Sequence, residues 1–207
     1  MRKYLKFIVY LALLTAFSGA RADSYVDFFR AINLDLADEV QALLAAGFDP
    51  NTLSESGQTP LYLALRDESP KVTAVLLASP ELKPDLANAA GETALMMAAL
   101  RGQLDAVRRL VALGARIQRS GWTPLHYAAS GPSTPVVAYL LDQGAAIDAV
   151  SPNGSTAVMM AARYGPEPTV ELLVARGADK KLRDKLNRTA FDLAGIAERE
   201  YLLPILR

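Results

Sequence analysis

The sequence predicts an all-α solenoid, a stack of helix–turn–helix units joined by hairpin-like loops. Two phrases that alternate along the chain indicate this fold. The first is a five-residue phrase centred on threonine; its threonines, at positions 59, 93, 123, 156 and 189, are separated by 34, 30, 33 and 33 residues. The second is an apolar run that ends in glycine. Such a period is typical of repeat proteins, in which each unit packs only against its neighbours.

The threonine phrase marks the start of the first helix in a unit. Threonine caps a helix N-terminus because its side-chain oxygen accepts a free backbone N–H, and proline suits the first helical position. Small pairs such as Ala98-Ala99, Ala128-Ala129 and Ala161-Ala162 follow, and they allow neighbouring units to approach closely. The five copies are Gly57-Gln58-Thr59-Pro60-Leu61, Gly91-Glu92-Thr93-Ala94-Leu95, Gly121-Trp122-Thr123-Pro124-Leu125, Gly154-Ser155-Thr156-Ala157-Val158 and Asn187-Arg188-Thr189-Ala190-Phe191.

The second phrase marks the end of the second helix. Glycine adopts the left-handed conformation that follows a helix C-terminus, so Gly47, Gly114, Gly144 and Gly177 are predicted helix ends. Between the two phrases the helical pattern breaks near Gly102, Pro132 or Gly165. Each unit is therefore a first helix, a turn, a second helix and a loop.

The first 22 residues are predicted to be a cleaved signal peptide. Arg2, Lys3 and Lys6 form a basic region, residues 7–17 are apolar, and Ala20-Arg21-Ala22 resembles a cleavage site. A membrane anchor is the alternative, but this apolar run is well short of the ~20 residues that cross a bilayer. The chain has no cysteine for lipid attachment. We therefore expect a periplasmic protein without a stable membrane anchor, with full secretion as the alternative.

Composition and charge exclude several classes of function. With 51% apolar and 21% charged residues, the chain is not of the disordered type. Once residues 1–22 are removed, 18 basic residues stand against 22 acidic ones, a net charge of −4. Nucleic-acid binding needs clustered Lys and Arg, and no such run is present. The lack of cysteine also excludes disulfides, thiolate metal sites and cysteine nucleophiles.

The phrase Thr123-Pro124-Leu125-His126-Tyr127-Ala128-Ala129 resembles the signature of the ankyrin repeat family, and the resemblance extends over residues 24–207. It implies a stack of L-shaped repeats, paired helices with projecting β-hairpin-like loops. The domain of residues 23–207 then holds about six units. Its approximate boundaries are 24–53 for the N-terminal cap, 54–86, 87–118, 119–150, 151–183, and 184–207 for the C-terminal cap.

The sequence offers little for catalysis. Its single histidine, His126, stands where the family hydrogen-bonds loop backbone, and no serine or cysteine nucleophile motif accompanies it. No metal-ligand spacing and no phosphate-binding glycine loop is present. We therefore expect neither enzyme activity, nor a metal, nor a cofactor. A hydrolase that uses a carboxylate pair remains a remote alternative, because 22 acidic residues supply candidates.

The resemblance also implies where a partner would bind, at the loop tips and at the last exposed turn of each first helix. The loop-tip candidates are Glu55, Gln58, Glu92, Trp122, Asn153, Ser155, Lys185 and Arg188. The first-helix candidates are Arg66, Asp67, Leu100, Arg101, Arg163 and Tyr164. From these, the predicted partner-binding residues are Arg66, Leu100, Arg101, Trp122, Arg163, Tyr164 and Arg188.

Trp122 is the most informative of these candidates because it is the only tryptophan and occupies a normally variable position. Trp, Tyr and Arg dominate interface hot spots, so Trp122, Arg101, Arg163 and Tyr164 form the preferred patch. Two interpretations stay open. Gly114 and Gly121 are seven residues apart where other repeats have ten; Trp122 either fills the space left by this short loop or lies beside a notch in the binding edge.

Two further features can be explained either by ordinary sequence variation and packing or by a functional role. Residues 79–84 replace a helix-ending glycine, which fits ordinary loop drift as well as a functional change. The pairs Met96-Met97 and Met159-Met160 could form an adaptable groove. We predict that they pack in the core, because sister repeats place Tyr62-Leu63 and His126-Tyr127 there.

Together these features predict an exported, monomeric recognition module that grips another protein on its concave face. A finer hypothesis is that it protects or inhibits an envelope protein, as a toxin immunity factor or as a helper of a peroxide-detoxifying enzyme. A passive structural scaffold with several weak partners is the alternative.

Overall fold

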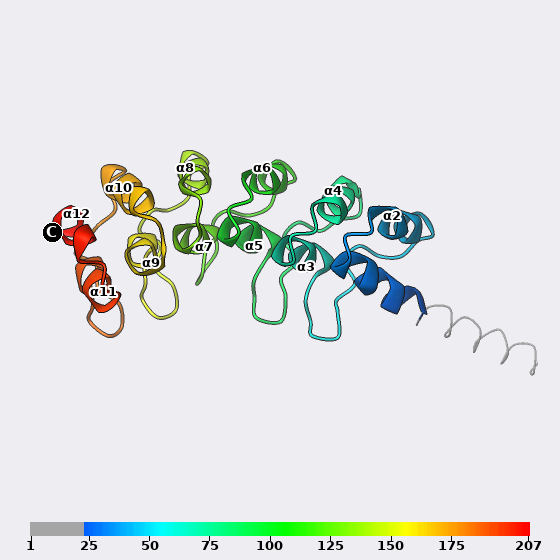
Figure 1. The fold of residues 1–207 in the computed structure, drawn as a ribbon, viewed down its shortest axis with the longest axis horizontal. Coiled ribbons are helices and arrows are strands. Elements are labelled where there is room, and N and C mark those ends of the chain that lie inside the picture. The colour runs from blue at the N-terminus through cyan, green and yellow to red at the C-terminus, as the bar shows by residue number, and fades with distance from the viewer. Residues whose placement is uncertain (1–22) are drawn as a thin grey trace, which may run out of the picture.

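The computed structural model describes residues 23–207, and this part of the chain is an all-α solenoid, which confirms the predicted fold class (Figure 1). The predicted signal peptide, residues 1–22, lies outside the described residues. Residues 23–33 are helical and pair with α2 (Ala37–Ala45). The later elements are α3 (Pro60–Arg66), α4 (Pro70–Ala78), α5 (Ala94–Leu100), α6 (Leu104–Ala112), α7 (Pro124–Ser130), α8 (Thr134–Asp142), α9 (Ala157–Tyr164), α10 (Glu167–Ala175), α11 (Ala190–Ile196), the 3-10 turn η1 (Glu200–Leu202) and α12 (Leu203–Leu206).

The helices begin and end where the two phrases predict. All five phrase threonines occupy the N-cap of a first helix, and the hydroxyl of Thr59, for example, accepts the N–H of Tyr62 at 3.2 Å. The helix-ending glycines adopt positive φ, from +86° at Gly144 to +91° at Gly47. Only the end of α4 differs, because Ser79 continues from it in an extended conformation.

The helices form two rows. The first helices α3, α5, α7, α9 and α11 pack side by side, and α2, α4, α6, α8 and α10 form a second row that arches over them (Figure 1). We call the surface formed by the first helices and the loops the inner face. The alanine pairs at 98–99, 128–129 and 161–162 are fully buried, which lets the first helices approach. No helix in residues 23–207 is long and apolar enough to cross a membrane.

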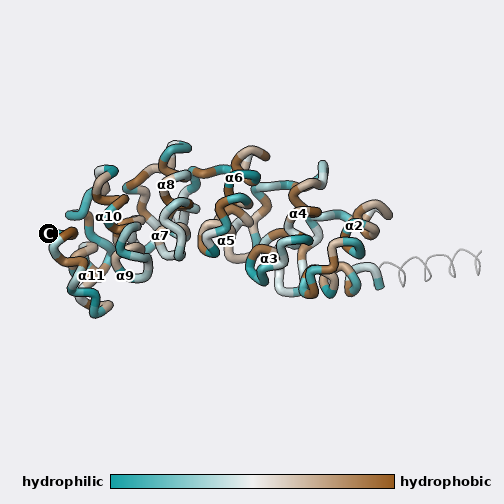
Figure 2. The backbone as a smooth tube through the Cα atoms, turned by 45° about the horizontal axis from the view of Figure 1, so that its top comes forward, coloured by the Kyte–Doolittle hydropathy of each residue, from teal (hydrophilic) through white to brown (hydrophobic). Residues whose placement is uncertain are grey.

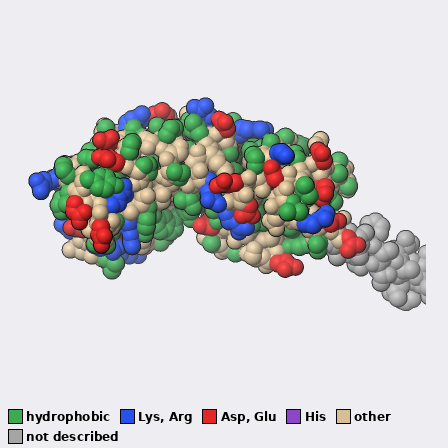
Figure 3. Space-filling view, in the orientation of Figure 1, with side chains coloured by type: hydrophobic (Ala, Val, Ile, Leu, Met, Phe, Trp, Pro, Cys, Tyr) green, Lys and Arg blue, Asp and Glu red, His purple; other side chains and the backbone are tan. Residues whose placement is uncertain are grey.

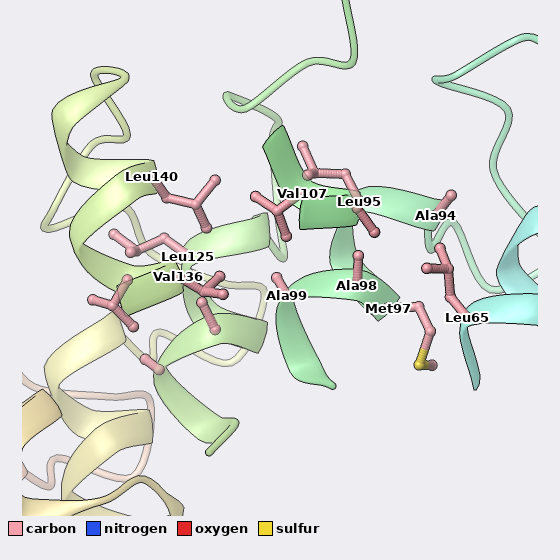
Figure 4. Packing of buried hydrophobic residues seen from close by; sticks show 14 of the residues in the cluster. Leu65, Ala94, Leu95, Met97, Ala98, Ala99, Val107, Leu125, Val136 and Leu140 are labelled. Atoms are coloured by element: carbon pink, nitrogen blue, oxygen red, sulfur yellow. The ribbon is translucent and has the colours of Figure 1, made fainter. Parts of the chain in front are cut away.

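The core runs continuously between the two rows. Figure 2 shows that hydrophobic residues concentrate in the helices, and Figure 4 shows Leu95, Leu125 and Leu140 within one buried cluster. Met96, Met97 and Met159 are at most 5% exposed, which confirms that they pack in the core. Met160 is the exception, since its side chain is only half-buried.

Neighbouring units also bond to each other at the helix ends. The last carbonyls of a helix have no partner within it, so another group must satisfy them. Gln103 donates its side-chain amide to the carbonyl of Leu65 at 3.1 Å. Arg199 donates to the carbonyls of Ala161 and Ala162 at 2.9 and 3.0 Å. Each contact joins a unit to the one before it.

Candidate functional site

Four of the five loops that precede first helices in residues 23–207 contain the same hydrogen-bonded turn. The first residue of the turn donates its backbone N–H to the carbonyl four residues later, and its side chain accepts the N–H of that same residue. The backbone pairs are Ser54 with Gln58, Asn88 with Glu92, Ser151 with Ser155, and Asp184 with Arg188, at 2.8–2.9 Å. Adjacent loops are joined as well, by Ala89 to Gly57 and by Lys185 to Asn153.

The loop before α7, residues 113–123, lacks this turn. Gln118 stands at the position of the first turn residue, but its side chain donates to the carbonyl of Gly144 at 2.6 Å instead. Gly114 and Gly121 are seven residues apart, whereas Gly47 and Gly57, and Gly144 and Gly154, are ten residues apart. Figure 1 shows it as the shortest loop, and Figure 3 shows the edge of the molecule recessed there, with hydrophobic side chains in the recess.

Beside this short loop the inner face holds a pocket of about 420 Å³. Its walls come from three successive first helices and the short loop. None of its lining residues is Asp, Glu, Lys or Arg. They are Leu100, Trp122, His126, Tyr127, Ser130, Met160 and Tyr164. Tyr164 is 56% exposed, so the pocket opens to solvent on this side. We refer to it as the inner-face pocket.

Aromatic rings build one wall of this pocket. The half-buried Trp122 ring lies 5.4 Å from the His126 ring and 6.4 Å from the Tyr127 ring, both at 80° between planes. Edge-to-face contacts of this kind are favourable, because the positive edge of one ring meets the negative face of another. Trp122 therefore packs against two rings of α7 and also lines the pocket, and its role in binding a partner stays a prediction.

His126 forms the hydrogen bonds to loop backbone that the family resemblance predicts. Its Nδ1 accepts the backbone N–H of Thr123 at 3.2 Å, so Nε2 carries the proton and donates to the carbonyl of Ser155 at 2.9 Å. Burial lowers the pKa of His126, although hydrogen bonds to backbone carbonyls oppose this shift. The neutral imidazole joins the start of α7 to the next loop, and both of its nitrogens are occupied.

Glu92 joins three units on the same face. Its carboxylate accepts the hydroxyl of Tyr62 at 2.8 Å, the hydroxyl of Tyr127 at 2.7 Å and the side-chain amide of Asn88 at 2.9 Å. Burial opposes ionisation of Glu92, but these three hydrogen bonds outweigh it and hold its pKa below the ordinary 4.5. Burial and the bond to Glu92 raise the pKa of Tyr62 to about 12 and shift that of Tyr127 in the same direction.

Replacing Glu92 with alanine should therefore destabilise the stack at neutral pH. The loss of its acceptor should cost about 1 kcal/mol, the low end for an unsatisfied hydroxyl, because water reaches part of the site. The pKa of Glu92 in the folded chain lies below its ordinary value of 4.5. The stabilisation by ionised Glu92 is therefore present above pH 4.5 and is lost as the pH falls through the folded pKa. Urea unfolding should show a difference between wild type and Glu92→Ala that shrinks on acidification, whereas Glu55→Ala, at an exposed position, should unfold like wild type at neutral pH.

The structure brings three of the predicted binding residues together. Leu100, Trp122 and Tyr164 line the inner-face pocket. Arg163 lies next to it, with its guanidinium carbon 5.1 Å from the centre of the Tyr164 ring. Three members of the preferred patch, Trp122, Arg163 and Tyr164, therefore lie together with Leu100 beside them, and their role in binding a partner stays a prediction.

The other three predicted residues lie elsewhere. Arg101 turns toward the preceding unit, where it donates to the carbonyl of Arg66 and lies 3.7 Å from Glu68. Arg66 itself pairs with Asp67 at 2.6 Å. Arg188 pairs with the buried Asp184 of its own loop at 2.6 Å. These arginines make contacts within and between repeats, and none of the three lines the inner-face pocket with Trp122.

Four pocket residues were not among the sequence candidates: His126, Tyr127, Ser130 and Met160. A signal for some of them was present in the spacing. Residues 126 and 130, and residues 160 and 164, are four apart in a helix and therefore lie on one helix face. This spacing links Ser130 to His126 and Met160 to Tyr164, but it does not find Tyr127.

Comparison with known proteins agrees with this architecture. A family model described as ankyrin repeats, in three copies, matches residues 28–120 and 115–184. The chain belongs to the ankyrin repeat family. Among ankyrin-containing relatives, the B-cell lymphoma 3 protein homolog of Mus musculus is 35% identical over 171 residues, 79% of this chain and 38% of that protein. The nuclear factor NF-kappa-B p105 subunit of Gallus gallus is 33% identical over 150 residues, 69% of this chain and 15% of that protein.

The chain thus spans less than half the length of these two curated relatives. In one solved structure, by contrast, nearly the whole of the matching chain is covered. It contains the predatory endopeptidase Bd0816 from Bdellovibrio bacteriovorus in complex with immunity protein Bd3460. The matching chain has a TM-score of 0.74 and 27% identity, and the alignment covers 87% of this ankyrin chain and 96% of that chain. Ankyrin repeats form protein-binding modules, and this chain is one.

Proposed function

We propose that this chain is an exported inhibitor of the immunity type, which binds an enzyme of the hydrolase class in the periplasm and keeps it inactive. The observation that carries the proposal is the likeness to the complex of Bd0816 with its immunity protein. That likeness covers 87% of this chain and 96% of the matching chain in that structure, which favours a similar role over a merely shared repeat.

The inner face supports this role. Hot spots of protein interfaces are apolar pockets and aromatic anchors near the centre of a contact surface, surrounded by polar groups. The inner-face pocket is lined by three successive units, and the exposed ring of Tyr164 lies at its opening. A partner segment could enter there while flanking loops contact its sides.

Export belongs to the same proposal. It is supported by the basic and apolar pattern of residues 1–22 and by the lack of cysteine, which suits an oxidising compartment. The proposal gives this chain no reaction of its own. In residues 23–207 no group of three or more His, Asp or Glu side chains is arranged to hold a metal ion.

The test has two steps. The affinity-tagged full chain is expressed in its own cell, the captured protein is identified by mass spectrometry, and that protein is then purified and its hydrolytic activity titrated with the purified chain. We expect activity to fall to baseline at one chain per enzyme molecule. An enzyme that forms the complex and keeps full activity would instead make the chain a scaffold.

A further inference from the structure

Four of the seven residues that line the inner-face pocket lie in an uncharged segment, and an arginine borders the pocket. Residues 120–141 contain no Asp, Glu, Lys or Arg. Arg163 adjoins the exposed Tyr164 at the rim, and none of the residues 23–207 forms an ion pair with it. At Arg163 the rim therefore carries a positive charge that no described residue neutralises.

The C-terminal half of the described chain is also net positive, whereas the N-terminal half is net negative. Residues 23–105 carry 13 acidic and 5 basic side chains, whereas residues 106–207 carry 9 acidic and 13 basic ones. The pocket lies near this change of sign. Glu92 accepts the hydroxyl of Tyr127, and it keeps its negative charge because its three hydrogen-bond donors are neutral, so it disfavours an anionic ligand next to Tyr127. At the Arg163 rim, complementary charge on a ligand would be negative.

The lining chemistry favours an aromatic ring as the occupant. Trp122, Tyr127 and Tyr164 offer ring faces and edges, which pair with another ring in offset or edge-to-face geometry. The thioether of Met160 also makes favourable contacts with aromatic edges. An aromatic side chain would thus find both apolar burial and oriented ring contacts.

We propose that the inner-face pocket receives an aromatic side chain with carboxylates on one or both sides, presented on an exposed loop of the partner enzyme. The identity of the partner rests on the proposed function. The ring lies among Trp122, Tyr127 and Met160, and the flanking carboxylate pairs with Arg163 at the rim. This contact anchors one loop of the enzyme at the middle of the inner face.

The chain itself supplies the probe for a test, because Trp122 is the only tryptophan and lines the pocket. Its fluorescence, excited where tyrosine does not absorb, is titrated with three terminally blocked pentapeptides: Gly-Asp-Phe-Asp-Gly, Gly-Asp-Ala-Asp-Gly and Gly-Lys-Phe-Lys-Gly. We expect the Trp122 fluorescence to change and to saturate as Gly-Asp-Phe-Asp-Gly is added. The alanine peptide should bind more than about tenfold more weakly, as loss of a buried aromatic predicts. The lysine peptide should bind about fivefold more weakly, as a rim charge predicts.

Two variants locate the site. Tyr164→Ala should weaken binding of both phenylalanine peptides, and Arg163→Glu should weaken the acidic peptide about fivefold while it favours the lysine peptide. Arg108→Glu is the matched control. This arginine also stacks on a tyrosine, with its guanidinium carbon 5.7 Å from the centre of the Tyr139 ring, but it belongs to α6 in the second row of helices. It should leave peptide binding unchanged, and circular dichroism should show all three variants folded.

Several results would overturn the proposal. They are the absence of a saturable change with the acidic phenylalanine peptide, an equal response to the alanine peptide, and an equal effect of Arg108→Glu and Arg163→Glu. Free 3-phenylpropionate that binds as tightly as the peptide would also overturn it, because the occupant would then be a small aromatic acid. Enzyme inhibition is measured in parallel: inhibition without peptide binding removes only this pocket assignment, and peptide binding without inhibition removes only the proposed function.

Discussion

Replacing Gly165 with alanine should strongly destabilise the stack. Gly165 follows α9 with an ordinary φ of −80°, so its backbone conformation does not require glycine. The added Cβ would, however, lie 2.2 Å from the carbonyl oxygen of Ala129 in α7 and 3.1 Å from Cα of Ala161. Both are backbone atoms of packed helices, so α7 and α9 must separate. We expect a loss of about 3 kcal/mol, which lowers the thermal midpoint by about 6–12 °C.

The matched control for this substitution is Gly195→Ala. Gly195 lies within α11, where no atom is found within 4 Å of the added Cβ. Alanine should stabilise this helix by about 0.5–1 kcal/mol, since it restricts the unfolded chain more than glycine does. Thermal and urea unfolding of both variants measure the contrast. Equal stability of Gly165→Ala and wild type would show that the first helices do not pack as closely as described.

Replacing Leu125 with alanine should have an effect of similar size through a cavity. Leu125 is 1% exposed and lies in the cluster with Val136 and Leu140 of α8 (Figure 4). Removal of a buried leucine side chain costs about 2–5 kcal/mol, because transfer energy is lost and the cavity collapses only in part. The unit is central, so weakening it also weakens its interfaces with both neighbours.

Leu186 provides the comparison for Leu125. It is 70% exposed in the loop before α11, so Leu186→Ala should change the free energy of unfolding by no more than about 0.5 kcal/mol. The measurement is urea unfolding followed by circular dichroism. If both leucine variants lost the same stability, the assignment of Leu125 to the core would be wrong.

The framework of the fold could be predicted from the sequence because local chemistry sets it. Thr59 and Thr189 cap their helices because a hydroxyl satisfies a free N–H nearby, and Gly47 ends a helix because it reaches positive φ. These rules act over a few residues, so a repeated phrase predicts a repeated unit. His126 follows the same logic, with one nitrogen bonded to its own N-cap.

The site was predictable only in part, because it depends on contacts between units. Glu92 was a loop-tip candidate, yet its carboxylate accepts hydroxyls from Tyr62 and Tyr127, which are 30 and 35 residues away. Arg101 follows directly after Leu100, but its side chain turns to the preceding unit while Leu100 lines the pocket. Neither direction follows from sequence spacing alone, because each is set by the neighbouring repeat.

The central claim is that this ankyrin chain binds its partner enzyme through the inner face around the pocket. Hydrogen–deuterium exchange of the chain, alone and in complex with the captured enzyme, tests it most directly. We predict slower exchange in residues 113–130 and 157–165 on binding, with α4, α6 and α8 unchanged. Protection confined to α4, α6 and α8, with the pocket segments exchanging as in the free chain, would contradict the claim.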